Sequence, residues 1–155
     1  MMNKKLNLSF SLSLLLIYIL AACGDQESVD TPSTESDLSS QTQSVPLDGG
    51  GSYTDVSADG LALMLETKDF PLINVHIPYA GEIEGTDEFI PFDQIEENID
   101  KLPADKDARV VIYCRSGSMS GISARTLVDL GYTDVWNLDG GMIAWEASGR
   151  PLQDN

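Results

Sequence analysis

The apolar run at 110–113 (VVIY), together with the pattern after it, constrains the fold more than any other part of the sequence. An uninterrupted apolar run of this length is typical of a strand that is buried on both faces. After a short loop, the segment 118–130 places Ala124 and Leu127 on one side and ends before Gly131, which predicts a helix. A buried strand that leads into a helix indicates an α/β fold with a parallel sheet.

Signals for strands and helices alternate in the same way along the rest of the folded part. Strands are predicted at 52–57, 71–77, 88–91, 109–114 and 134–138, and helices at 58–67, 93–102, 118–130 and within 140–151. Asp93 and Glu96 form a capping pattern for the second helix, which is expected to bury Ile95, Ile99 and Leu102. Because strands separated by helices pair in parallel, we expect a three-layer domain with helices on both faces of a mostly parallel five-stranded sheet.

The first 22 residues have the composition of a targeting segment. Two basic residues, Lys4 and Lys5, precede an apolar run at 12–20 that is short for a membrane span. The sequence LAAC, which ends at Cys23, resembles the lipobox of bacterial lipoproteins. This resemblance implies a signal peptide at 1–22, a lipid on Cys23, and a domain tethered to the membrane on the extracytoplasmic side of the bacterial envelope. The alternative is an uncleaved anchor in which Cys23 is incidental.

The charge balance argues against one class of partner. The chain has 9 Lys and Arg against 25 Asp and Glu, a net charge of −16. Nucleic acid is bound by basic surfaces, so it is not an expected partner. Residues 24–51 are rich in Ser, Thr, Gln, Asp and Gly and contain no basic residue. We therefore expect 23–51 to be the acylated Cys and a disordered acidic linker, and 52–155 to be the folded domain.

Cys114 closes a predicted strand, and the next helix begins four residues later. In an open parallel sheet, sites form at the carboxyl ends of strands, next to the amino ends of the following helices. The loop CRSGSMS should therefore direct backbone N–H groups toward the sulfur and lower the pKa of the thiol. Small side chains at Ser116, Gly117 and Ser118 suit such a cradle, and Arg115 supplies a charge for an anionic substrate.

Three segments carry a family resemblance: PLINVHIPYAGEIEG, VVIYCRSGSMS and NLDGGMIAWEASGRP. They resemble, in this order, segments of single-domain rhodaneses, which carry sulfane sulfur as a persulfide on one Cys. The resemblance implies a rhodanese-like fold, Cys114 as the catalytic nucleophile, a small anionic sulfur donor, and a thiol or cyanide as acceptor. It implies neither a metal nor a cofactor. The expected substrate-binding residues are Arg115, Ser116, Gly117, Ser118, Met119 and Ser120.

The length of the loop separates rhodaneses from related phosphatases. The six residues from Cys114 to Met119 match the rhodanese loop, whereas the phosphatases place an Arg at the position that Ser120 occupies in this chain. Without that Arg a phosphate dianion lacks its bidentate partner, so phosphatase activity is a weak alternative.

Several positions depart from the rhodanese pattern. Met119 occupies a position at which many rhodaneses carry a second Arg. Asn74 and His76 occupy the positions of an Asp and an Arg of the family, and Glu82 occupies the position of a His. With one loop cation instead of two, a doubly charged donor should bind less tightly, by about 1.5–3 kcal/mol. Thiosulfate is therefore expected to be a poor donor. His76 is expected to be a polar residue at a strand end.

Three functions remain open at this point. The first is an extracytoplasmic sulfurtransferase that carries sulfur on Cys114. The second is a catalytically weak rhodanese module that binds a partner. The third is a redox-sensing thiol. With Cys23 lipidated, Cys114 has no partner for a disulfide, and its loop favours a reactive thiol over a structural one.

Overall fold

The structure is a computed structural model and describes residues 34–154. The predicted signal peptide at 1–22 and the predicted lipidation of Cys23 lie outside the described residues. Within 34–154, none of the helices combines the length and the hydropathy of a membrane span.

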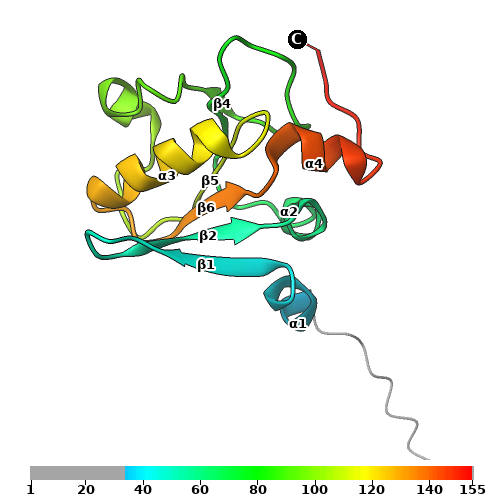
Figure 1. The fold of residues 1–155 in the computed structure, drawn as a ribbon, viewed down its shortest axis with the longest axis horizontal. Helices are drawn as coiled ribbons and strands as arrows, with labels where there is room; N and C mark the ends of the chain where they lie inside the picture. Colours follow the sequence, from blue (N-terminus) through cyan, green and yellow to red (C-terminus); the bar gives the residue numbers. More distant parts are fainter. Residues whose placement is uncertain (1–33, 155) are drawn as a thin grey trace, which may run out of the picture. The chain divides into compact units, whose positions relative to one another are not determined.

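The described chain forms a six-stranded sheet with helices on both faces (Figure 1). In chain order the elements are α1 (Thr34–Ser39), β1 (Thr42–Pro46), β2 (Ser52–Val56), α2 (Ala58–Leu65), β3 (Leu72–Asn74), β4 (Glu88–Phe89), the 3-10 helix η1 (Glu96–Lys101), β5 (Val110–Tyr113), α3 (Ser118–Asp129), β6 (Val135–Leu138) and α4 (Gly141–Ala147). The strand order is β1-β2-β6-β5-β3-β4, and every pairing is parallel except β1 with β2. The α/β prediction is confirmed.

Strand β5 is covered on both faces, which explains why its sequence is apolar at every position. Val110 and Ile112 belong to the cluster that packs under α3, whereas Val111 and Tyr113 belong to the cluster that packs against α2 and α4. All four side chains are fully buried. The central strand is therefore covered on both faces, and its carboxyl end delivers Cys114 to the edge where α3 and α4 begin.

The edge strand β1 corrects two predictions. It lies within 23–51, which we expected to be disordered, and it makes the sheet six-stranded instead of five-stranded. β1 pairs antiparallel with β2 from Thr42 opposite Val56 to Pro46 opposite Ser52. Its side chains are mostly polar because an edge strand is held mainly by backbone hydrogen bonds to its neighbour. The side chains of Val45 in β1 and of Leu47 just after it add partial burial against the core. Composition alone missed this kind of strand.

The segment after β4 also differs from its prediction. It is a 3-10 helix that begins after Ile95, and no side chain caps it, so the predicted capping by Asp93 is wrong. Ile95 and Leu102 are buried as expected, but Ile99 is 38% exposed. A 3-10 helix has about 3.0 residues per turn, so a spacing of four and then three residues does not keep three side chains on one face.

Candidate active site

Cys114 lies immediately after β5 and before the amino end of α3. Its residue is only 1% exposed. Gly117 is the N-cap of α3 and has a φ of 88°, a left-handed conformation that favours glycine. This turn curls the loop so that its amide groups face back toward the sulfur, as the sequence predicted.

Hydrogen-bond donors of the loop contact the sulfur of Cys114 directly. The backbone N–H of Gly117 donates to Sγ over 3.1 Å, and the hydroxyl of Ser120 lies 3.4 Å from Sγ. The same hydroxyl lies 3.2 Å from the carbonyl oxygen of Gly117. Its single proton can therefore turn toward the sulfur when the sulfur is negatively charged.

These contacts set the charge of the thiol. Burial is the largest single influence on the pKa of Cys114 and by itself raises it, because it disfavours the thiolate. Hydrogen bonds from the Ser120 hydroxyl and from the backbone N–H groups of Ser120, Ser116 and Gly117 act in the opposite direction. Together they outweigh burial, so the pKa lies below the ordinary value for a cysteine. The site therefore favours a nucleophilic thiolate.

The other predicted site residues fall into two groups. Arg115, Ser116 and Ser118 are exposed, and the Ser116 and Ser118 hydroxyls lie 3.4 Å apart. Met119 is instead partly buried and packs against the core cluster under α3. The only charged side chain in the loop from 114 to 120 is therefore that of Arg115.

Backbone hydrogen bonds from the first turn of α4 fix the loop that carries Cys114. The sequence analysis missed this role of α4. The N–H of Met142 donates to the carbonyl oxygen of Cys114 at 2.9 Å, and the N–H of Ile143 donates to that of Arg115 at 3.0 Å. Gly141 has a φ of 57°, and a Cβ there would clash with the Cys114 carbonyl oxygen. The pair Gly140–Gly141 was the available signal, because adjacent glycines indicate a close approach of two backbones.

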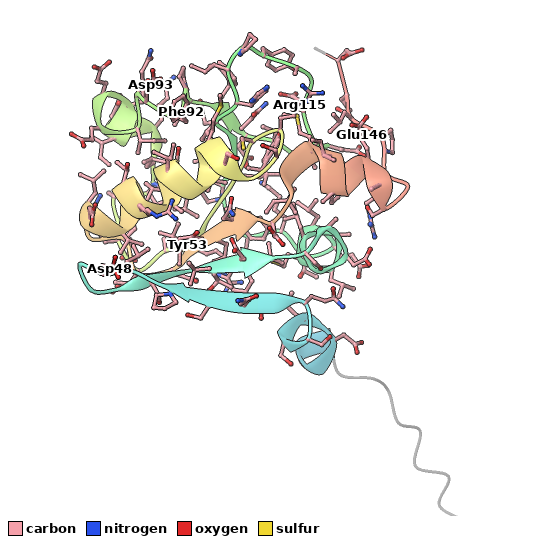
Figure 2. All side chains as sticks on the ribbon, in the orientation of Figure 1. Asp48, Tyr53, Phe92, Asp93, Arg115 and Glu146 are labelled. Atoms are coloured by element: carbon pink, nitrogen blue, oxygen red, sulfur yellow. The ribbon has the colours of Figure 1, made fainter. Side chains whose placement is uncertain are left out.

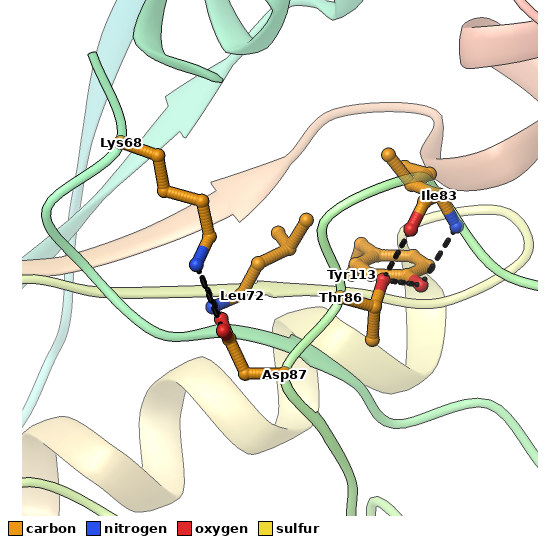
Figure 3. Close-up of polar contacts among 6 residues, drawn as sticks. All are labelled: Lys68, Leu72, Ile83, Thr86, Asp87 and Tyr113. Carbon is orange, nitrogen blue, oxygen red and sulfur yellow. Dashed lines mark hydrogen bonds and ion pairs between the residues drawn. The ribbon is translucent and has the colours of Figure 1, made fainter. Parts of the chain in front are cut away.

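A second support comes from the side chain of Tyr113, next to Cys114. Its hydroxyl accepts a hydrogen bond from the N–H of Ile83 at 3.0 Å and lies 2.6 Å from the Thr86 hydroxyl (Figure 3). Burial, the largest influence, raises the pKa of Tyr113 to about 12, so this hydroxyl stays protonated. The turn at 81–86 is thereby fixed to the strand that carries the thiol.

Asn74 and His76 occupy the positions where the sequence departs from the rhodanese pattern. The Asn74 amide donates to the carbonyl oxygen of Gly81 at 3.1 Å and accepts from the N–H of His76 at 3.0 Å, so it organises the loop after β3. The Nδ1 atom of His76 is buried and has no hydrogen-bond partner among the described residues. Burial, and then the positive charge of Arg115, lower the pKa of His76. The imidazole is therefore neutral near pH 7.

The described residues contain no group of three or more His, Cys, Asp or Glu side chains that could hold a metal ion. The chemistry available to the loop is that of a single activated thiolate, a set of hydrogen-bond donors and one guanidinium.

A mostly parallel sheet with a thiol in the loop between its central strand and the following helix is the arrangement expected of a rhodanese-like domain. The model of the Rhodanese-like domain family matches residues 58–148, from the start of α2 to the residue that follows α4. The chain belongs to this family.

Its relatives agree with that assignment. The chain is 34% identical over 102 residues to a sulfurtransferase of Allochromatium vinosum, a match that covers 63% of this chain and 92% of the relative. It is 30% identical over 99 residues to the thiosulfate sulfurtransferase GlpE of Shewanella oneidensis, with 61% and 93% of the two chains covered. A crystal structure of a rhodanese-like domain protein from Staphylococcus aureus matches with a TM-score of 0.54 at 27% identity, over 64% of this chain and 98% of that one. The protein is a sulfurtransferase of the rhodanese type.

Proposed function

We propose that this protein is an extracytoplasmic sulfurtransferase that carries sulfane sulfur as a persulfide on Cys114. The observation that carries the proposal is the cradle around Sγ, in which the N–H of Gly117 donates at 3.1 Å and the hydroxyl of Ser120 lies at 3.4 Å. These donors stabilise a thiolate in the free enzyme, and the loop amides stabilise the terminal sulfur of a persulfide in the same way.

The first half-reaction loads the sulfur. The Cys114 thiolate attacks the outer sulfur of a donor such as thiosulfate, and an S–S bond forms to Sγ. The bond between the outer sulfur and the sulfonate sulfur breaks, and sulfite leaves with its electron pair. This is covalent catalysis by an activated nucleophile, and no proton has to be moved when the thiol is already ionised.

The second half-reaction returns the enzyme to its thiolate form. A thiolate, or cyanide in an assay, attacks the terminal sulfur of the persulfide, and Cys114 leaves as the thiolate. The same donors that activate the nucleophile therefore stabilise the leaving group. The cycle uses only residues of the loop and requires neither a metal nor a cofactor.

The charge of the loop limits the choice of donor. Arg115 is exposed next to Cys114 and supplies a positive charge for a small anion, whereas Met119 packs toward the core. A dianionic donor therefore meets one guanidinium instead of two. We propose that thiosulfate is a slow donor and that the physiological donor carries less charge.

The location in the envelope is part of the same proposal. Cleavage after residue 22 and acylation of Cys23 would leave the domain tethered to the membrane. Labelling cells with a radioactive fatty acid tests this, because the label should enter the protein and should be lost in Cys23→Ala.

The activity is tested by measuring thiocyanate formed from thiosulfate and cyanide. We expect parallel lines in double-reciprocal plots, the pattern of two half-reactions that share a covalent intermediate, and no activity in Cys114→Ser. A partner-binding module without catalysis would form no thiocyanate from any donor, and that result would overturn the proposal.

A further inference from the structure

A groove with a volume of about 370 Å³ lies between α3 and the segment that leads into η1. Ile95, which is 1% exposed, and the partly buried Phe92 belong to its apolar lining. Ile122 on α3 also lines the groove and is 48% exposed, which leaves a large aliphatic side chain in contact with solvent. The groove therefore presents apolar surface that can be covered by a partner.

The charged residues of the groove all carry the same sign. Asp93, Glu96 and Glu97 line it and are exposed, and no Lys, Arg or His is among its lining residues. None of the three takes part in an ion pair recorded within residues 34–154. An apolar groove with an acidic rim complements an apolar segment flanked by basic side chains.

The groove lies against α3, the helix that follows the loop carrying the thiol. Ile122 lies four residues after Ser118, the first residue of α3, which corresponds to about 6 Å along the helix axis. The hydroxyl of Ser123 lies 3.4 Å from the carbonyl oxygen of Phe92, so the far wall of the groove is joined to the same helix. Figure 2 shows Phe92 and Asp93 beside α3, and Arg115 near the amino end of that helix. A segment seated in the groove would therefore lie along the helix whose N-cap residue, Gly117, contacts the thiol.

We propose that this groove docks the sulfur acceptor, and that the acceptor is a protein whose thiol lies in an apolar segment flanked by Lys or Arg. The inference rests on the proposed function, because the group transferred is the terminal sulfur of the Cys114 persulfide. The acceptor thiolate attacks that sulfur, a new S–S bond forms on the acceptor, and the bond to Sγ breaks with Cys114 leaving as the thiolate. The acidic rim repels small anionic thiols and attracts a basic protein surface, mainly by raising the rate of encounter.

The test uses two synthetic peptides as probes. Each contains one Cys between leucines, and they differ only in having Lys or Glu on both flanks. The rate constant for sulfur transfer from the loaded full chain should be about tenfold higher for the Lys peptide at low ionic strength, and the difference should shrink with added salt. Equal rates for the two peptides would overturn the proposal.

Matched variants separate the groove from the overall charge. The triple variant Asp93→Asn, Glu96→Gln, Glu97→Gln should lower the rate with the Lys peptide about tenfold. The control Asp48→Asn, Glu66→Gln, Asp69→Asn removes the same charge from exposed positions that do not line the groove, and should change the rate less than about twofold. Equal effects of the two triples would assign the preference to net charge and contradict a docking groove.

Two further readouts keep this inference distinct from the proposed function. Transfer to cyanide should be unchanged in both triple variants, because cyanide does not need the groove.

If the wild-type chain never loads sulfur, the proposed function fails, and the docking groove is then tested by peptide binding alone. A Lys peptide with Cys replaced by Ser should bind more weakly to the groove triple than to the control triple in fluorescence anisotropy. Equal binding to both would overturn the inference.

Discussion

The backbone N–H of Met142 donates to the carbonyl oxygen of Cys114 at 2.9 Å. Together with the bond from Ile143 to Arg115, this contact ties the first turn of α4 to the loop that carries the thiol. The loop carbonyl groups are thus satisfied by α4, while the N–H of Gly117 remains directed at the sulfur. The geometry of the thiol site therefore depends on a helix that contributes no side chain to the chemistry.

Gly141→Ala tests this dependence. The new Cβ would clash with the Cys114 carbonyl oxygen and lie 2.8 Å from the Arg115 carbonyl carbon, at a φ of 57° that side chains rarely adopt. We expect sulfurtransferase activity to be lost and the free energy of unfolding, measured with urea, to fall by about 3 kcal/mol or more.

The matched control for that variant is Gly149→Ala. Gly149 also has a positive φ, 86°, but a Cβ there would meet no atom within 4 Å. This substitution should cost about 1 kcal/mol and leave the activity intact. If both variants behave alike, the contact between α4 and the loop has no special role.

Ser120→Ala should move the reactivity of Cys114 to higher pH. The Ser120 hydroxyl is one of the donors that lower the pKa of the thiol, so removing it raises that pKa toward the ordinary value. Only the thiolate reacts with iodoacetamide, so the alkylation rate rises with pH as Cys114 ionises. In the wild type this rise should occur below the pH typical of a free cysteine. In the variant it should occur at a higher pH than in the wild type.

Ser123→Ala is the control for this shift. Ser123 is fully buried on the same helix, but its hydroxyl faces the Phe92 carbonyl oxygen instead of the sulfur. Its alkylation profile should coincide with that of the wild type. If the alkylation rate of Ser120→Ala rises at the same pH as that of the wild type, the hydroxyl does not stabilise the thiolate.

Met119→Arg should improve the use of thiosulfate. Met119 is only partly buried, so the longer Arg side chain can lay its methylene groups on the core and carry its guanidinium to the loop surface. There it adds a charge-assisted hydrogen bond to a dianionic donor, worth about 1.5–3 kcal/mol, so KM for thiosulfate should fall by about tenfold or more. Met119→Gln adds polarity without charge and should leave KM nearly unchanged. An equal gain in both variants would mean that charge at this position does not limit donor binding.

A chain that begins at Ser52 should be less stable than one that begins at Thr34. The shorter chain loses α1, the strand β1 that pairs with β2, and the side chains of Val45 and Leu47 that pack against the core. We expect the free energy of unfolding in urea to fall by about 2–4 kcal/mol. Equal stability would mean that the segment before Ser52 is only a linker, as its composition suggested.

Much of the fold could be predicted from the sequence because each buried element carries a periodic apolar pattern. The fully apolar strand β5 and the helix α3 were recognised on this basis, and their order placed Cys114 at the correct end of the sheet. The edge strand β1 was missed because its stability comes from backbone pairing with β2, which leaves little trace in side-chain pattern.

The candidate site was predictable to a similar extent. The loop from Cys114 to Ser120 was identified from its position and its small residues, and the structure brings Gly117 and Ser120 to the sulfur. The inward turn of Met119 and the contact of Met142 with the loop could not be predicted, because both depend on packing between elements that are distant in the sequence.

The most direct test of the account is the mass of the intact protein after treatment with a sulfane sulfur donor. The wild-type chain should gain the mass of one sulfur atom, located on the peptide that contains Cys114, and should lose it again when cyanide is added. Cys114→Ser should show no gain. A wild-type chain that gains no sulfur from thiosulfate or from a less charged polysulfide donor, or a gain that persists in Cys114→Ser, would contradict a persulfide carried on Cys114.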